Sequence, residues 1–238
     1  YAQAIKEIGA QLNTIRRQHG ANAIGSYLGN PGMINSAGAM FQSAFLKGLG
    51  SHSNYSAVSV DTSNLHLVCK EMYGSEMAML IPDVDHAKCM LLLGTNPAVS
   101  TIGWVDCVPE GWQRILAAQS KGSDLIIVDP QETPSTRKAN THIKIRPGED
   151  WAFLLGMIKI IVAQGWENVE DCAAASNLST LQNLLHDVSL ENLSKRCEVP
   201  TAQITDIARR FAHAETGFCV ARTGVAQNRN GTIGEWLS

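Results

Sequence analysis

Side chains that could bind a nucleotide follow an apolar run at residues 91–93. They are Gly94, Asn96, Pro97 and Ser100. Glycine permits close approach of the backbone, the asparagine amide can both donate and accept, and the serine hydroxyl can bind phosphate. Ligands of open parallel sheets bind outside the carboxyl ends of the strands, so this segment is a candidate phosphate-binding loop. Taken alone, the same residues also describe an ordinary Asn-Pro turn.

A second candidate follows the apolar run at residues 126–128, where Asp129 and Pro130 stand. A carboxylate at a strand end, one β–α–β unit after a phosphate-binding loop, is where dinucleotide-binding folds hold a ribose. Asp-Pro pairs also begin turns and helices, so both interpretations stay open.

A third candidate, at residues 146–150, contains Gly148 and Asp150. The glycine has free choice of φ, and the aspartate can cap the helix predicted to follow. Capping alone would account for this aspartate.

The elements that would position these segments alternate between helix and strand. Periodicity and turn signals predict helices at residues 4–19, 36–49, 62–73, 109–121, 150–164, 178–187 and 201–213, with Thr201 as the cap of the last. Apolar runs predict strands at residues 23–28, 88–93, 124–128, 141–145 and 218–221. Strands that are apolar throughout and separated by helices indicate an α/β fold, with a Rossmann-like parallel sheet covered by helices on both faces.

The stretch at residues 51–62 is polar, which predicts a loop there and a domain boundary near residue 60. We expect residues 1–60 to be part of one α/β domain and residues 61–238 to form a dinucleotide-binding domain. The chain begins inside a predicted helix and finishes just as another begins, so we interpret it as an internal piece of a longer protein.

The composition excludes several classes of protein. With 45% hydrophobic and 17% charged residues, the chain has ordinary globular composition. A net charge of −3 provides no electrostatic footprint for nucleic acid or anionic lipid. The longest apolar run, at residues 153–162, is too short for direct membrane insertion. Six cysteines without a Cys-x-x-Cys pair favour free thiols in a reducing compartment. We therefore expect a cytoplasmic protein, or a periplasmic one if a leader precedes this sequence.

The order and spacing of these segments resemble the molybdopterin oxidoreductase family, of the dimethyl sulfoxide reductase and formate dehydrogenase type. The resemblance begins in residues 20–30, continues through the three candidate segments and Thr133, and ends in residues 223–231. It implies a molybdenum or tungsten bis(molybdopterin guanine dinucleotide) cofactor in the full-length protein. It also implies two-electron redox chemistry on a small-molecule substrate, with an electron-transfer partner protein or subunit.

The resemblance assigns roles to particular residues. One dinucleotide arm would be held by Gly94, Asn96, Pro97, Ser100, Asp129 and Pro130; the loop over the guanine would contain Gly148 and Asp150; and a loop near the pterin would contain Arg222, Gly224 and Gln227. Gln131 stands where the family commonly has arginine. The iron–sulfur cluster of the family, held by upstream cysteines, and a C-terminal barrel would lie outside this sequence. We therefore expect this piece to hold part of a site, with no cofactor bound and no turnover.

The family also supplies a metal ligand from the loop before the helix that is predicted to end at Gly74. Counting back about a dozen residues reaches Asp61, a hard oxygen ligand suited to a high-valent metal. Cys69 is a softer alternative, but it lies in the middle of that helix. Two further interpretations stay open: Asp61 caps the helix, or the protein provides no ligand.

Two other functions compete with a catalytic one. The chain could belong to a non-catalytic scaffold relative, such as the large iron–sulfur subunit of respiratory complex I, or to the middle domain of a thiamine-diphosphate enzyme. Asn96, Asp129 and Gly148 favour the catalytic interpretation, because a scaffold has no reason to keep them. The spacing between residues 129–130 and 146–148 argues against the thiamine-diphosphate enzyme.

Overall fold

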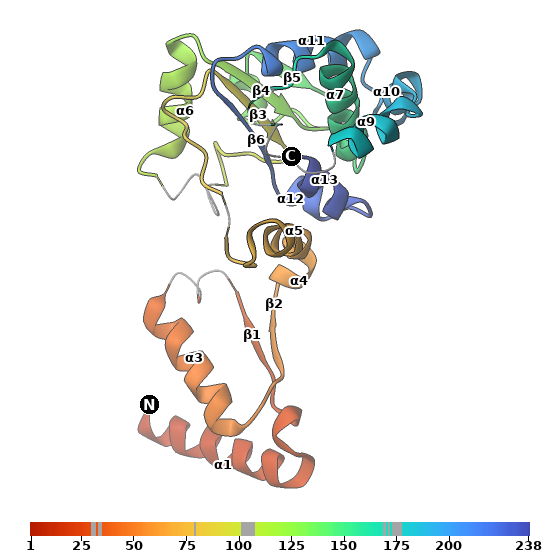
Figure 1. Ribbon diagram of the computed structural model, residues 1–238. Coiled ribbons are helices and arrows are strands. Elements are labelled where there is room, and N and C mark those ends of the chain that lie inside the picture. Colours follow the sequence, from red (N-terminus) through yellow and green to blue (C-terminus); the bar gives the residue numbers. More distant parts are fainter. Residues whose placement is uncertain are drawn as a thin grey trace. The chain divides into compact units, whose positions relative to one another are not determined.

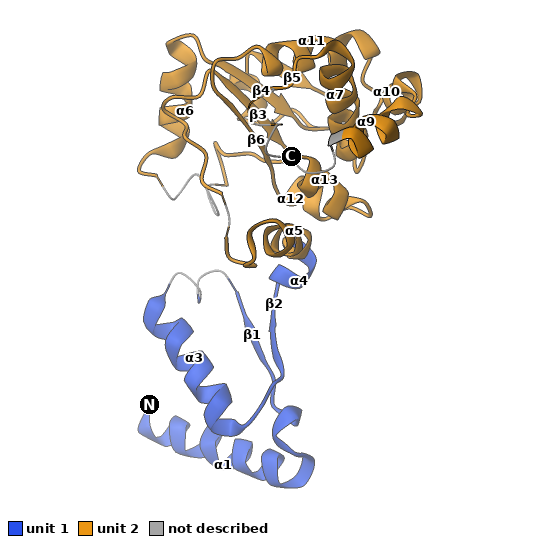
Figure 2. Cartoon of the chain, in the orientation of Figure 1, with its two compact units in different colours: residues 1–61 blue, residues 62–238 orange. Residues whose placement is uncertain are grey.

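The computed structural model describes residues 1–29, 32, 35–78, 80–100, 108–168, 170, 172 and 178–238. Asn30, the last residue of the resembling segment at residues 20–30, and Cys107 lie outside the described residues. The chain divides into two compact units, Tyr1–Asp61 and Thr62–Ser238 (Figures 1 and 2). This division falls one residue from the expected boundary at 60.

Unit 1 pairs two short parallel strands with helices. Its elements are α1 (Ala2–His19), a 3₁₀ turn (Ala21–Ala23), β1 (Ser26–Leu28), α3 (Ser36–Leu49), β2 (Asn54–Ser56) and α4 (Val58–Asp61). In the strand pair, Ser26 lies opposite Asn54. Strand β2 and helix α4 fall in the stretch predicted to be a loop. That prediction is wrong. The strand was missed because Asn54–Ser56 is short, polar and largely exposed, so its sequence lacks the apolar pattern that marks a strand.

The sheet of unit 2 has four parallel strands in the order β5-β4-β3-β6. They are β3 (Cys89–Leu93), β4 (Asp124–Val128), β5 (Thr141–Ile143) and β6 (Gly217–Ala221). The parallel pairing confirms the predicted α/β class. The chain runs outward from β3 through β4 to β5, then returns to place β6 on the other side of β3. The strand order therefore reverses between β3 and β6, which is where open α/β sheets form ligand crevices.

Helices cover both faces of this sheet, with α7 (Asp150–Gln164), α10 (Leu190–Cys197) and α11 (Thr201–Ala212) on one face and α6 (Gly111–Ser120) on the other (Figure 1). The unit also contains α5 (Ser63–Tyr73), α9 (Leu178–His186), α12 (Thr223–Ala226) and α13 (Gly231–Leu237), with a 3₁₀ turn at Thr136–Lys138. The predicted cap at Thr201 is wrong, because Pro200 takes the N-cap position and no side chain caps that helix. Within the described residues, no helix is both long and apolar enough to cross a membrane.

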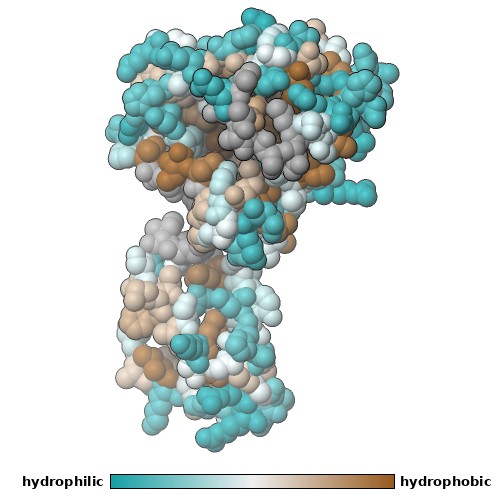
Figure 3. Space-filling view, in the orientation of Figure 1, coloured by the Kyte–Doolittle hydropathy of each residue, from teal (hydrophilic) through white to brown (hydrophobic). Residues whose placement is uncertain are grey.

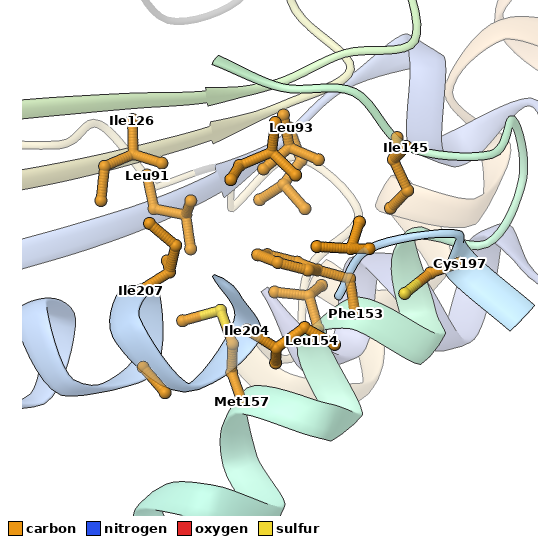
Figure 4. Close-up of a cluster of buried hydrophobic side chains, with 14 of the residues drawn as sticks. Leu91, Leu93, Ile126, Ile145, Phe153, Leu154, Met157, Cys197, Ile204 and Ile207 are labelled. Atoms are coloured by element: carbon orange, nitrogen blue, oxygen red, sulfur yellow. The ribbon is translucent and has the colours of Figure 1, made fainter. Parts of the chain in front are cut away.

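Side-chain alternation along the strands divides the core of unit 2 into two layers. On β3, Leu91 and Leu93 face a layer that includes Phe153 of α7 and Ile204 and Ile207 of α11 (Figure 4). The intervening side chains of β3 face the other layer, which includes residues of α6. All of β3 is buried, which explains why its sequence is apolar throughout. In the view of Figure 3, most of the outer surface over the helices of this unit is hydrophilic.

Candidate functional site

The carboxyl ends of β3 and β6 meet at two glycines. The Gly224 N–H donates to the Gly94 carbonyl at 3.0 Å, and the Arg222 N–H donates to the Leu93 carbonyl at 3.1 Å. A Cβ on Gly94 would lie 2.8 Å from the Cα of Gly224, and the φ of Gly94 is +58°. Both the backbone conformation and the close contact therefore require glycine at position 94.

A cavity of about 200 Å³ lies at this edge of the sheet. Its walls come from four loops and consist of Gly94, Asp129, Pro130, Gln131, Pro147, Gly148, Asp150, Gly224 and Asn228. The tertiary structure thus brings together residues from all three candidate segments and from the segment around Gly224. The remaining residues predicted to bind the cofactor are not among the lining residues: Asn96, Pro97, Ser100, Arg222 and Gln227.

Asp129 combines a turn role with a place in the cavity wall. Its Oδ1 accepts a hydrogen bond from the Gln131 N–H at 2.8 Å, which closes a short turn. Its carbonyl accepts from Nε2 of His142 at 2.8 Å, and its N–H donates to the Ile143 carbonyl at 3.0 Å. These bonds hold the carboxylate at the carboxyl end of β4.

Asp150 does not cap α7, contrary to the sequence prediction. Glu149 takes the N-cap position, and Asp150 is the first helical residue, with only 6% of its surface exposed. Burial raises the pKa of Asp150 to about 6, and the charges of Asp129 and Glu149 also raise this pKa, while a hydrogen bond from the backbone N–H of Asp150 lowers it. At neutral pH this residue therefore presents a mainly ionised, largely desolvated carboxylate. Such a group is well suited to accept hydrogen bonds from a ligand.

Asn228 lies between the segment around Gly224 and the loop at Gly148, and it was not among the predicted site residues. Its Nδ2 donates to the carbonyls of Gly224 and Val225 at 2.5 and 3.4 Å. Its Oδ1 lies 3.0 Å from where a Cβ on Gly148 would be, and Gly148 has a φ of +81°. Asn228 lies inside the resembling segment at residues 223–231, but no spacing rule singles out its side chain.

A fully buried serine ties the loop after β3 to the loop after β4. The Ser135 hydroxyl donates to Oδ1 of Asn96 at 2.7 Å and accepts from the Ala98 N–H at 2.9 Å. The carbonyl of Asn96 also accepts from the N–H groups of Val99 and Ser100 at 3.0 and 2.8 Å. Asn96 therefore forms the turn that one interpretation predicted, and sequence reasoning missed its partner Ser135.

Arg222 lines a second cavity, of about 300 Å³, together with Cys69 and Glu235. Glu235 is 5% exposed, and its Oε1 has no hydrogen-bond partner among the described residues. Burial raises the pKa of Glu235 to about 7, against a lowering effect of the Arg222 charge. Burial also raises the pKa of Cys69, with a further rise from the charge of Glu235. Cys69 is thus a packed thiol rather than a thiolate.

Asp61 ends α4 and belongs to unit 1, while Thr62 takes the N-cap position of α5. In the part of the chain that the structure describes, no three His, Cys, Asp or Glu side chains gather as a metal site. The five described cysteines are free thiols.

Comparison with known proteins identifies the class to which this fold and site belong. The sequence model of the molybdopterin oxidoreductase family matches residues 2–216, and the chain belongs to that family. The family implies a molybdenum- or tungsten-molybdopterin cofactor.

Individual relatives agree with this assignment. The assimilatory nitrate reductase catalytic subunit of Bacillus subtilis is 25% identical over 241 residues, covering 98% of this chain and 32% of that protein. The molybdopterin-containing subunit of thiosulfate reductase from Salmonella typhimurium is 25% identical over 216 residues, covering 89% of this chain and 26% of that protein. The fold matches acetylene hydratase from Pelobacter acetylenicus with a TM-score of 0.77 at 21% identity, over 99% of this chain and 31% of that one. The chain therefore spans about a third or less of the length of these proteins.

Proposed function

We propose that this chain is part of a molybdenum or tungsten oxidoreductase and that its 200 Å³ cavity binds the guanine end of one bis(molybdopterin guanine dinucleotide) arm. The observation that carries the proposal is the convergence of four loops at the reversal of strand order. Residues from all three candidate segments meet there, beside the contact between Gly94 and Gly224.

The chemistry of the cavity suits that group. The glycines leave backbone accessible to a phosphate or a sugar, and the carboxylates of Asp129 and Asp150 can accept from ribose hydroxyls and guanine N–H groups. The cavity is smaller than the roughly 300–1,000 Å³ of typical ligand pockets. Its volume therefore suits one end of a dinucleotide rather than the whole.

The bound cofactor would supply two-electron redox chemistry at its metal. The residues of this chain would bind and orient its nucleotide end and shield it from water. Asp61 would ligate the metal as a hard oxygen donor. The buried Cys69 is a poor candidate, because burial disfavours the thiolate that a metal needs.

Several components would lie outside this chain. An iron–sulfur cluster and an electron-transfer partner subunit would carry electrons to or from a small-molecule substrate. Relatives support a subunit partner, since the NADPH-Fe(3+) oxidoreductase protein of Geobacter sulfurreducens is named as subunit alpha. The interpretation as a non-catalytic scaffold would instead leave the full-length protein without stoichiometric metal, which elemental analysis tests directly.

Titration of this chain with GDP and ADP tests the nucleotide site. We expect weak binding that prefers GDP, with NMR shifts at cavity residues, because these loops provide only some of the walls that exclude water. Asp150→Asn should weaken GDP binding about 10- to 100-fold, since it removes a charged acceptor. The control Asp206→Asn alters an aspartate paired with Arg209 and Arg210 on α11 and should bind normally. Equal affinity for ADP and GDP, or no response at the cavity, would reject the site.

A further inference from the structure

Two walls of the proposed nucleotide cavity come from loops that Ser135 connects. The loop after β3 contributes Gly94, and the loop after β4 contributes Asp129, Pro130 and Gln131. Ser135 belongs to the second loop and bonds twice to the first, at Asn96 and Ala98. Since its side chain is 0% exposed, water cannot substitute for either bond.

Counting donors sets the orientation of the Asn96 amide. A serine hydroxyl has one hydrogen and two acceptor lone pairs. The Ala98 N–H uses one lone pair, so the buried hydroxyl hydrogen still requires an acceptor. The oxygen Oδ1 of Asn96, at 2.7 Å, is that acceptor. The amide nitrogen of Asn96 must therefore take the other position. A reversed amide would bring two donors together and leave the hydroxyl hydrogen without a partner.

The turn that carries Ser135 is itself held rigidly. The Thr133 N–H donates to Oγ1 of Thr136 at 2.7 Å, and the Thr136 N–H donates to Oγ1 of Thr133 at 3.1 Å. Thr136 is 3% exposed. This reciprocal pair places the Ser135 hydroxyl in one position before any ligand arrives.

The amide nitrogen of Asn96 remains available to a ligand. Among the residues that the structure describes, Asn96 is half-buried and its Nδ2 donates to no protein acceptor. A fixed amide donor at the carboxyl end of a central strand suits a phosphate oxygen. An acceptor oxygen held in the same place would repel a phosphate oxygen.

We propose that Ser135 is a positioning residue that acts through Asn96. It holds the side-chain amide with the donor outward and fixes the two loops against each other, so that Asn96 can bind the diphosphate of the nucleotide. This inference rests on the proposed nucleotide site and adds a determinant of phosphate recognition to it.

Calorimetric titration of this chain with GDP and with guanosine tests the proposal. Ser135→Ala should weaken GDP binding at least fivefold and leave guanosine binding within twofold. Asn96→Ala should weaken GDP binding equally, and the double variant should be no more than twofold weaker than Asn96→Ala alone. The matched control Ser123→Ala changes a 5% exposed serine next to the start of β4 and should leave both affinities unchanged.

The alternatives give different results. Losses that multiply in the double variant, or that are equal for GDP and guanosine, mean that Ser135 only stabilises the fold, and they overturn the proposal. A wild-type chain that binds neither compound refutes the nucleotide site itself. Should Ser135→Ala fail to fold, the Asn96→Asp variant, at a half-buried position, still tests whether the Asn96 amide binds the phosphates. It keeps the acceptor for Ser135 but replaces the donor by a negative charge, so it must weaken GDP binding selectively.

Discussion

A Cβ atom on Gly224 would lie 2.7 Å from the Cα of Gly94 and 2.8 Å from its carbonyl oxygen. This contact joins the loop that follows β3 to the first turn after β6, across the reversal of strand order. Two segments far apart in the sequence thereby form one continuous backbone surface beside the cavity. Side chains at either position would push the segments apart, so the contact defines the geometry of the proposed site.

Gly94→Ala should lower the free energy of unfolding by about 2–4 kcal/mol. Its left-handed backbone costs about 1 kcal/mol for alanine, and the crowding adds roughly 1–3 kcal/mol. Gly165→Ala is the matched control, because Gly165 has a similar φ of +64° but no atom within 4 Å of the added Cβ. Urea unfolding compares the two variants. Equal losses in the free energy of unfolding would show that the contact with Gly224 adds nothing to the destabilisation.

The stability of unit 2 should fall as the pH rises from about 4.5 to about 7. The pKa of Glu235 is about 7 in the folded chain, above its ordinary value of 4.5, so the folded state binds more protons than the unfolded state in this window. The stabilisation is complete below pH 4.5 and is lost as the pH rises through 7. It amounts to about 3 kcal/mol.

Glu235→Gln should remove the fall in stability between about pH 6 and pH 7, and should make the chain more stable than wild type above pH 7, because the buried charge is gone. Below about pH 6 a fall should remain, because the pKa of Asp150 is also raised, to about 6. Glu215→Gln, at an exposed position, is the control and should keep the wild-type slope. Urea unfolding at pH 5, 6, 7 and 8 measures the profile. A profile that rises with pH in both wild type and Glu235→Gln would contradict the assignment.

GDP affinity should increase as the pH rises through about 6. Burial places the pKa of Asp150 there, and only the ionised carboxylate can accept from two guanine N–H groups. Asp150→Asn should bind weakly and with a flat profile between pH 5 and 7.5. A wild-type affinity that does not change over this range would show that Asp150 does not take part in guanine recognition.

Arg210→Ala should destabilise the chain by about 1.5–3 kcal/mol. The guanidinium makes two bonds to the Asp124 carboxylate, at 2.6 and 2.8 Å, and one to Oγ1 of Thr141 at 3.0 Å, and thus ties α11 to β4 and β5. Both ionic side chains are only a quarter exposed. Arg137→Ala breaks an ion pair that is about 60% exposed and should cost less than about 0.5 kcal/mol. Comparable losses from the two variants would contradict this ranking.

In the full-length enzyme, Asp61→Ala should abolish turnover yet leave the dinucleotide bound, because the change removes only the proposed metal ligand. Cys69→Ala should retain activity and lose a modest amount of stability, as expected for a packed thiol that is 3% exposed. Activity assays combined with nucleotide release and analysis check both variants. The opposite pattern would transfer the ligand role to Cys69.

Local patterns in the sequence were sufficient for much of the fold. The helices Ser36–Leu49 and Asp150–Gln164 and the strand Asp124–Val128 occur at their predicted bounds, because capping signals, C-terminal glycines and apolar runs act over a few residues. The polar strand β2 was missed for the same reason, since nothing local distinguishes it from a loop. The family was also recognisable, because it depends on the order of short motifs along the chain.

The sequence by itself determined the α/β class, the parallel strands and the loops that carry chemistry, since these follow from short-range periodicity. Only the tertiary structure decided which side chains of those loops meet. It placed Gly224 against Gly94, buried Asp150 at a helix start where it was expected to cap, and paired Asn96 with Ser135. Such pairings depend on strand order and on burial, which remove water and force each polar group to find a partner from a distant segment.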